Sequence, residues 1–105
     1  MDIQLKRGLL DVCVLVAIKN EDSYGYKIIK DVAPYIEMSE STLYTILKRL
    51  ELAEMLTVRT SEHNGRLRKY YHITPAGLAR IEDFKNEWRE VMSIYQFVIK
   101  EDAKK

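Results

Sequence analysis

The chain has 105 residues, of which 47% are hydrophobic and 31% are charged, and its formal net charge is +1. This size accommodates one domain, or one domain with a protruding element, and the composition excludes a disordered tail protein. The only cysteine, Cys13, excludes an intrachain disulfide and is expected to pack as a small hydrophobic side chain. The apolar run around it is too short to span a bilayer, and no signal-peptide pattern precedes it, so we expect a cytoplasmic protein without membrane contacts.

Two helices are predicted in the first third of the chain. Residues 9–18 form an apolar run that is long enough for a central buried helix. A second helix is expected to follow a polar break and to run to about Val32, with Asp22 or Ser23 as its N-cap. Pro34 ends this helix, because it disfavours helical geometry in the preceding residue and cannot donate a backbone hydrogen bond.

A third helix is predicted to begin after Ser39, whose hydroxyl is a favourable N-cap. Apolar side chains recur along it at i, i+3, i+4 and i+7, which indicates a face packed against the core: Leu43, Ile46, Leu47 and Leu50. The opposite face carries polar side chains, with Thr42 and Arg49 on a flank: Ser41, Tyr44, Thr45 and Lys48. Three short helices with tight connections are typical of a helix-turn-helix core.

After the third helix the hydrophobic period changes from helical to alternating. Residues 56–60 alternate apolar and polar side chains, and residues 71–74 do so more weakly. Between these segments, Asn64-Gly65 is a strong signal for a tight hairpin turn. A β-hairpin that follows three helices indicates a winged helix-turn-helix, so we predict a mainly α fold with a small β-hairpin.

A long C-terminal helix is predicted from Pro75 to about Lys100. Thr74 supplies an N-cap hydroxyl, proline suits the first helical position, and Gly77 is tolerable in the first turn. Apolar residues then recur at alternating spacings of 3 and 4, as in a coiled-coil seam: Ile81, Phe84, Trp88, Val91, Tyr95 and Val98. Because the chain has no second long helix to cover this seam, the predicted partner is another copy of the protein.

Positive charge is concentrated in the predicted hairpin. Residues 59–70 contain four basic side chains against one acidic, a net charge of +3, whereas residues 75–105 hold six of each sign. Arg66, Arg68 and Lys69 lie in or just after the turn, where a wing can contact the DNA backbone or the minor groove. In isolation such a cluster is usually a solubilising surface, and the polar face of the third helix is an ordinary solvated face. Their succession along the chain favours nucleic-acid binding.

Trp88 admits two interpretations. As a seam residue it belongs to the dimer core, and as a large flat aromatic near a two-fold axis it can stack on a planar ligand. The neighbours expected around such a ligand are Met92, Cys13, Val16 and Phe84. His63 and His72 have no metal-ligand spacing with Cys13, and no nucleophile or phosphate-loop motif is present, so we expect no metal, no cofactor and no catalysis.

Three segments resemble the PadR-like family of transcriptional regulators and occur in the order found in that family. Ser23-Tyr24-Gly25-Tyr26 is similar to the S-Y-G-Y signature, and residues 41–51 resemble the recognition helix. Residues 68–77 are similar to the second wing strand and the start of the dimerisation helix. Each motif alone is weak, but together they cover most of residues 9–80. The resemblance implies a DNA-binding regulator and adds Tyr24 to the expected contacts.

The single long C-terminal helix is similar to that of a short, multidrug-responsive subgroup of the family. In that subgroup a tryptophan on the helix stacks on flat drugs at the dimer interface, and Trp88 falls at the matching position. The resemblance implies a planar ligand at Trp88, and repression of the protein's own gene or of a neighbouring transporter gene.

One residue departs from the family pattern. Glu54 stands where the family usually has glycine, in the turn after the recognition helix. Either Glu54 adopts a left-handed conformation at a cost of about 1 kcal/mol, or the helix ends differently and the wing is re-aimed.

The sequence thus predicts a homodimeric transcriptional regulator, with a winged helix-turn-helix DNA-binding domain at 1–74 and a C-terminal dimerisation helix and tail at 75–105. Two recognition helices are expected to enter successive major grooves of a pseudo-palindromic operator, ~34 Å apart. The expected DNA contacts are Tyr24, Ser41, Thr42, Tyr44, Thr45, Lys48, Arg66, Arg68 and Lys69. The alternatives are a winged-helix module that binds protein rather than DNA, which the low net charge favours, and a drug-sequestering protein without a DNA site.

Overall fold

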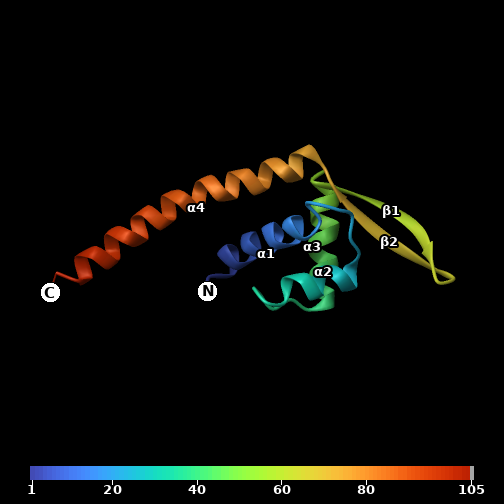
Figure 1. The fold of residues 1–105 in the computed structure, drawn as a ribbon, viewed down its shortest axis with the longest axis horizontal. Coiled ribbons are helices and arrows are strands. Elements are labelled where there is room, and N and C mark those ends of the chain that lie inside the picture. Colours follow the sequence, from blue (N-terminus) through green and yellow to red (C-terminus); the bar gives the residue numbers. More distant parts are fainter. Residues whose placement is uncertain (105) are drawn as a thin grey trace.

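The computed structural model describes residues 1–104 and contains a helical body, a hairpin and one long helix. The elements follow the predicted order: α1 (Ile3–Ala17), α2 (Gly25–Val32), α3 (Glu40–Leu52), β1 (Leu56–His63), β2 (Arg66–Ile73) and α4 (Pro75–Asp102). Figure 1 shows the hairpin extending from one end of the body, while α4 runs back along α1 and continues beyond it. The predicted mainly α fold with a β-hairpin wing is confirmed.

The core lies where α1, α2, α3 and the base of the hairpin meet. The whole apolar stripe predicted for α3 is buried, with each of its four side chains no more than 2% exposed. It packs against α1, α2 and the strands through Leu15, Ile18, Ile28, Leu56 and Tyr71. Full burial of a large aliphatic side chain stabilises the fold by about 1.5–3 kcal/mol, so this stripe fixes the opposite face of α3 toward solvent.

Two of the predicted N-caps are confirmed and one is wrong. Ser39 Oγ accepts a hydrogen bond from the Thr42 backbone N–H at 3.2 Å, and the Thr74 hydroxyl caps α4 in the same way. Neither Asp22 nor Ser23 caps α2, whose N-cap is Tyr24 without a side-chain hydrogen bond. The backbone of Ser23 instead exchanges two hydrogen bonds with Tyr71 of β2, which keeps the chain extended until Tyr24.

The hairpin is longer than the sequence pattern indicated. β1 and β2 pair in one continuous antiparallel register from Leu56↔Ile73 to His63↔Arg66. Asn64 and Gly65 form the predicted two-residue turn, with φ values of 51° and 78°, as a type I′ turn requires. The outer half of the wing has no buried face, so its strands lack the apolar alternation by which a strand is recognised in sequence.

The turn after α3 keeps the left-handed conformation that glycine usually supplies. Glu54 has a φ of 59°. Its N–H bonds to the Glu51 carbonyl and the Met55 N–H to the Leu50 carbonyl, both at 2.9 Å, which is a Schellman motif. The first of the two alternatives for Glu54 is therefore the one that the structure adopts.

The first turn of α4 requires glycine at position 77. A Cβ at this position would lie 2.3 Å from the Met55 carbonyl oxygen and 2.7 Å from Ile73 Cγ1. The same region is held by the Thr74 hydroxyl, which donates to the Glu54 carbonyl at 2.7 Å, and by the Thr74 N–H, which donates to Met55 at 3.1 Å. Only a residue without a side chain lets α4 start this close to the end of α3.

Glu54→Gly is expected to raise the free energy of unfolding by about 1 kcal/mol, because it removes the left-handed penalty of a residue with a Cβ. Urea unfolding at fixed protein concentration measures the change. Ala53→Gly is the matched control: Ala53 has φ −84°, so glycine there brings only its backbone entropy and should destabilise the protein. A loss of stability in Glu54→Gly would contradict the left-handed assignment.

Gly77→Ala is expected to lower the free energy of unfolding by about 2–3 kcal/mol, because the added methyl overlaps the Met55 carbonyl. Gly8→Ala is expected to change the free energy of unfolding in the opposite direction. At Gly8, in α1, an added Cβ meets only the end of the Arg80 side chain at 3.9 Å, so alanine should stabilise the helix by up to about 1 kcal/mol. Equal effects of the two substitutions on the urea midpoint would rule out the close α3–α4 contact.

Candidate nucleic-acid interface

The surface of α3 opposite the core is polar and open to solvent. Ser41, Tyr44, Thr45 and Lys48 are exposed, while Thr42 is half-buried on the flank. The Tyr44 hydroxyl lies over Gly25 at the start of α2, where a Cβ would come within 2.8 Å of it. Gly25 therefore leaves room for Tyr44, which connects the S-Y-G-Y segment with the exposed face of α3.

A stack of aromatic and guanidinium groups joins the wing to the start of α2. The Arg68 guanidinium lies over the Tyr24 ring, 3.8 Å from its centroid. Tyr70 meets Tyr24 edge-on with centroids 5.9 Å apart, and Arg59 lies over Tyr70 at 4.6 Å. Cation–π contacts at exposed sites contribute about 0.5–1 kcal/mol each, and Arg68 also donates a hydrogen bond to the Tyr70 hydroxyl at 3.3 Å, so the stack holds both arginines in place.

The structure brings four of the predicted DNA-contact residues together. Tyr24, Tyr44, Arg68 and Lys69 line one open groove of about 620 Å³ between the start of α2, α3 and β2. Lys48 lines the next groove along α3, again with Tyr44 and Lys69. The three hydroxyl residues, Ser41, Thr42 and Thr45, line a groove that α3 shares with α1. Arg66 lies apart from these at the tip of the wing, beside His63 and Asn64.

One carboxylate anchors the base of the wing. Asp22, in the loop before α2, lies 2.7 Å from His72 Nδ1 and accepts a hydrogen bond from Arg59 Nε at 3.3 Å. These partners, with His72 contributing most, hold the pKa of the Asp22 carboxyl below its usual value. Together with the Ser23–Tyr71 bridge, this contact ties both strands to the α1–α2 loop. Sequence reasoning missed the pairing of Arg59 with Asp22, because the two positions are 37 residues apart.

Arg49 has a structural partner within the helical body. Its guanidinium forms a part-buried ion pair with Asp11 of α1. The charge of Arg49 is thus compensated inside the protein, and Arg49 holds α1 against α3.

The C-terminal half of α4 is exposed along its whole length. Val91, Tyr95 and Val98 of the predicted seam are 42%, 52% and 50% exposed. Ile81 differs from the other seam positions, because it is only 3% exposed and lies in the protomer's own core. The apolar face that remains open to a partner therefore begins at Phe84.

The predicted ligand residues are divided between two places. Cys13, Val16 and Phe84 line a mainly apolar groove of about 570 Å³ between α1, α2 and α4, and burial raises the pKa of the Cys13 thiol. Trp88 and Met92 are not among its lining residues, although the Trp88 ring lies 5.8 Å from that of Phe84. Within residues 1–104 there is no cluster of three potential metal ligands, and no helix is long and apolar enough to cross a membrane.

Three helices, a twisted hairpin with an arginine-rich face and an exposed hydroxyl-bearing third helix define a winged helix-turn-helix protein. Residues 14–83 match the model of the transcriptional regulator PadR-like family. The chain belongs to this family, whose members regulate transcription rather than catalyse reactions, and the resemblance of the three sequence motifs to the PadR-like family is confirmed.

Individual relatives support the same assignment. A protein of Lysinibacillus sphaericus is 36% identical over 93 residues, which cover 84% of this chain and 85% of that protein. A PadR family transcription regulator from Clostridium difficile R20291 is 33% identical with a TM-score of 0.77, over 85% of this chain and 97% of its own. PadR from Bacillus subtilis, solved in complex with operator DNA, is 22% identical with a TM-score of 0.68, over 72% of this chain and 46% of its own; it shares the fold.

Asp22→Asn is expected to lower the free energy of unfolding at pH 7 by about 1 kcal/mol, since it weakens the hydrogen bonds to His72 and Arg59. Because the folded-state pKa of Asp22 is lowered, this stabilisation is present above the unfolded pKa and is lost as the pH falls from about 4 through the folded pKa. Urea unfolding at pH 7 and near pH 2 measures the loss of stability and its dependence on pH. Asp83→Asn on exposed α4 is the control, and a difference from wild type that stays constant with pH would refute the anchor.

Proposed function

We propose that this protein is a homodimeric repressor that binds a pseudo-palindromic operator through α3 and the wing. The observation that carries the proposal is the joining of the exposed face of α3 to the wing arginines: Tyr24 contacts Arg68 by stacking and shares one groove with Tyr44. If the polar face of α3 were only a solvent-exposed surface, it would not need a connection to the wing. The operator complex of the Bacillus subtilis relative, which has the same fold, supports DNA as the ligand.

In the proposed complex α3 enters the major groove, with its hydroxyls and Lys48 directed at base edges and phosphates. Arg68, held on Tyr24, contacts the backbone beside the start of α2, and Arg66 at the wing tip reaches the adjacent minor groove. The full set of proposed contacts is Tyr24, Ser41, Thr42, Tyr44, Thr45, Lys48, Arg66, Arg68 and Lys69.

The proposed dimer forms through α4, with residues 1–74 as the DNA-binding domain and residues 75–105 as the dimerisation helix and tail. The seam residues Val91, Tyr95 and Val98 support this arrangement, because a monomer would leave these large apolar side chains exposed to water. Two copies then present their recognition helices ~34 Å apart, one turn of DNA.

We further propose that a planar aromatic molecule bound between the two α4 helices at Trp88 releases the operator. The tilted Phe84–Trp88 pair at the start of the open seam supports an aromatic site. Such a molecule can shift the DNA equilibrium only by its different affinity for the DNA-bound and free arrangements of the dimer.

The test is a fluorescence-anisotropy titration of the protein against its own upstream DNA and a scrambled duplex at physiological salt. We expect a preference of about 10³-fold or more for the upstream DNA. Replacing Arg66, Arg68 and Lys69 together with alanine should weaken binding to both duplexes. The slope of log affinity against log salt should fall by up to about 5, or ~0.9 for each of the six contacts in a dimer.

The other outcomes separate the alternatives. Equal, weak and salt-sensitive binding to both duplexes would contradict a site in the upstream DNA. The absence of binding to either duplex would refute the DNA role and favour the protein-binding module. An unchanged salt slope in the triple variant would show that the wing does not contact the DNA.

A further inference from the structure

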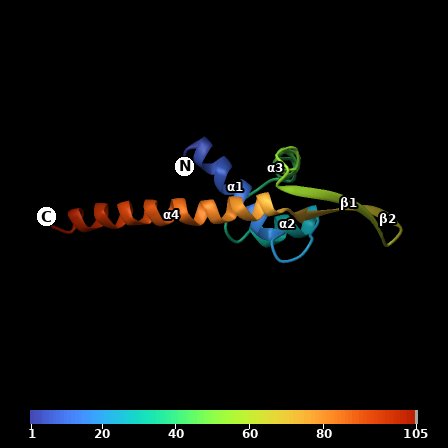
Figure 2. The same ribbon diagram turned by 90° about the horizontal axis from the view of Figure 1, so that it is seen from above.

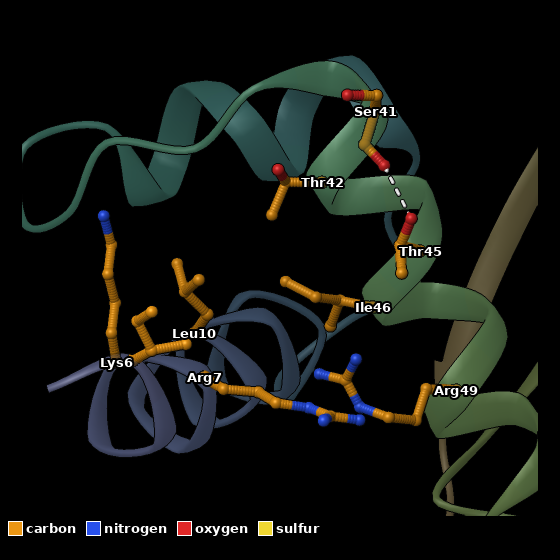
Figure 3. Close-up of a pocket in the computed structure, with 9 residues that line it drawn as sticks. Lys6, Arg7, Leu10, Ser41, Thr42, Thr45, Ile46 and Arg49 are labelled. Atoms are coloured by element: carbon orange, nitrogen blue, oxygen red, sulfur yellow. Dashed lines mark hydrogen bonds between the residues drawn. The ribbon is translucent and has the colours of Figure 1, made fainter.

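A second groove borders the exposed face of α3, on the side that faces α1. It has a volume of about 370 Å³ and is shown in Figure 3. One wall comes from α1 with Lys6 and Arg7, the other comes from α3 with Ser41 and Thr42, and Leu10 and Ile46 lie between them. None of the sequence patterns singled out this part of α1, because its basic residues are separated from α3 by more than 30 positions.

The groove carries positive charge that the protein does not neutralise. Arg49 at its end is paired with Asp11. Lys6 and Arg7 are exposed, and within residues 1–104 neither side chain makes an ion pair or a side-chain hydrogen bond. Figure 3 shows Arg7 pointing toward Arg49, whose own charge is compensated by Asp11. The unpaired positive charge of Lys6 and Arg7 favours an anion at this groove.

The hydroxyl wall is suited to donate to that anion. Ser39 Oγ donates to Thr42 Oγ1 at 2.9 Å, so the Thr42 hydroxyl accepts within the protein and its own hydrogen remains available. Thr45 differs, because its hydroxyl donates to the Ser41 carbonyl at 3.0 Å. Ser41 Oγ lies 3.3 Å from Ser39 Oγ and is the donor in that contact, because Ser39 gives its only hydrogen to Thr42. Phosphate oxygens accept such bonds, and the Thr42 hydroxyl lies at the N-terminal end of α3, where the helix dipole favours negative charge.

The position of the groove identifies the source of the phosphate. A helix in the major groove has a sugar–phosphate strand on each side, because that groove is only about 12 Å wide. The wing and the start of α2 lie on one side of α3. Figure 2, in which α3 is seen end-on, shows the first turns of α1 on the other side and at the same edge of the molecule. The contacts expected from sequence supply cations on the wing side alone.

We propose that Lys6 and Arg7, with the Thr42 hydroxyl, bind the DNA backbone strand that lies opposite the wing. This inference rests on the proposed function, in that α3 must occupy the major groove. It makes the first turns of α1 a third DNA-binding element, so that each recognition helix is held between cations on both of its sides.

The experiment compares wild type with the double variant Lys6→Gln/Arg7→Gln, using a duplex that the wild-type protein selects from a randomised pool and a scrambled duplex of equal length. A dimer of the variant loses four phosphate contacts, so the salt slope should fall by up to about 3.6. The affinity at physiological salt should fall roughly tenfold or more on both duplexes, and the preference for the selected duplex should stay unchanged, because phosphate contacts carry no sequence information.

Two controls accompany the double variant. Lys100→Gln/Lys104→Gln removes the same charge from the far end of α4 and should keep the wild-type slope, while Lys6→Arg/Arg7→Lys keeps both cations and should also keep it. A wild-type slope in Lys6→Gln/Arg7→Gln, with selective binding by the wild type, overturns this inference alone. If the wild type binds neither duplex, the proposed function fails and this inference fails with it.

Discussion

The recognition helix, the wing and α4 all meet at the peptide of Met55. Its N–H closes the Schellman turn at the end of α3, and its carbonyl accepts from Thr74 while packing against the bare Cα of Gly77. β1 begins one residue later. The direction of α4 relative to α3 is therefore fixed by backbone contacts rather than by adaptable side chains, and the left-handed residue at Glu54 is what makes the turn possible.

Some basic side chains in this protein are paired with carboxylates and others are not, a difference that the net charge of +1 does not reveal. Asp11 and Asp22 each neutralise an arginine that holds two elements together, at the α1–α3 contact and at the base of the wing. Within the part of the chain that the structure describes, the basic residues without an acidic partner include those beside α3 and along the wing: Lys6, Arg7, Lys48, Arg66, Arg68 and Lys69. An arginine that is paired with a carboxylate is not available to neutralise a phosphate, and which arginines are paired is known only from the three-dimensional structure.

The sequence predicted the elements whose signals are local. The α3 stripe, the Ser39 and Thr74 caps and the Asn64-Gly65 turn each depend on residues within a few positions of one another, and all are confirmed. The predicted N-cap of α2 was wrong, and the predicted strands were too short. The N-cap depends on a backbone bridge to Tyr71 and the strand length on the pairing of two polar strands, and both are contacts between distant segments. The same limit concealed the groove at α1. The roles of the DNA-contact, seam and ligand residues remain predictions, and the structure supplies only their positions.

The close contact at Gly77 has a mechanical consequence. Because α3 is held along its length by its buried stripe and at its C-terminal end by the backbone contacts next to Gly77, it moves as one rigid body with the helices around it. Its N-terminal end with Ser41 lies one helix length from the Gly77 contact. Over the ~18 Å between these ends, a rotation of about 10° carries the N-terminal end through about 3 Å. That displacement is close to the ~3.4 Å rise of one base step. In the proposed dimer, a small change in how the two α4 helices cross would thus move each α3 by one base step, enough to take it out of register with the proposed half-site.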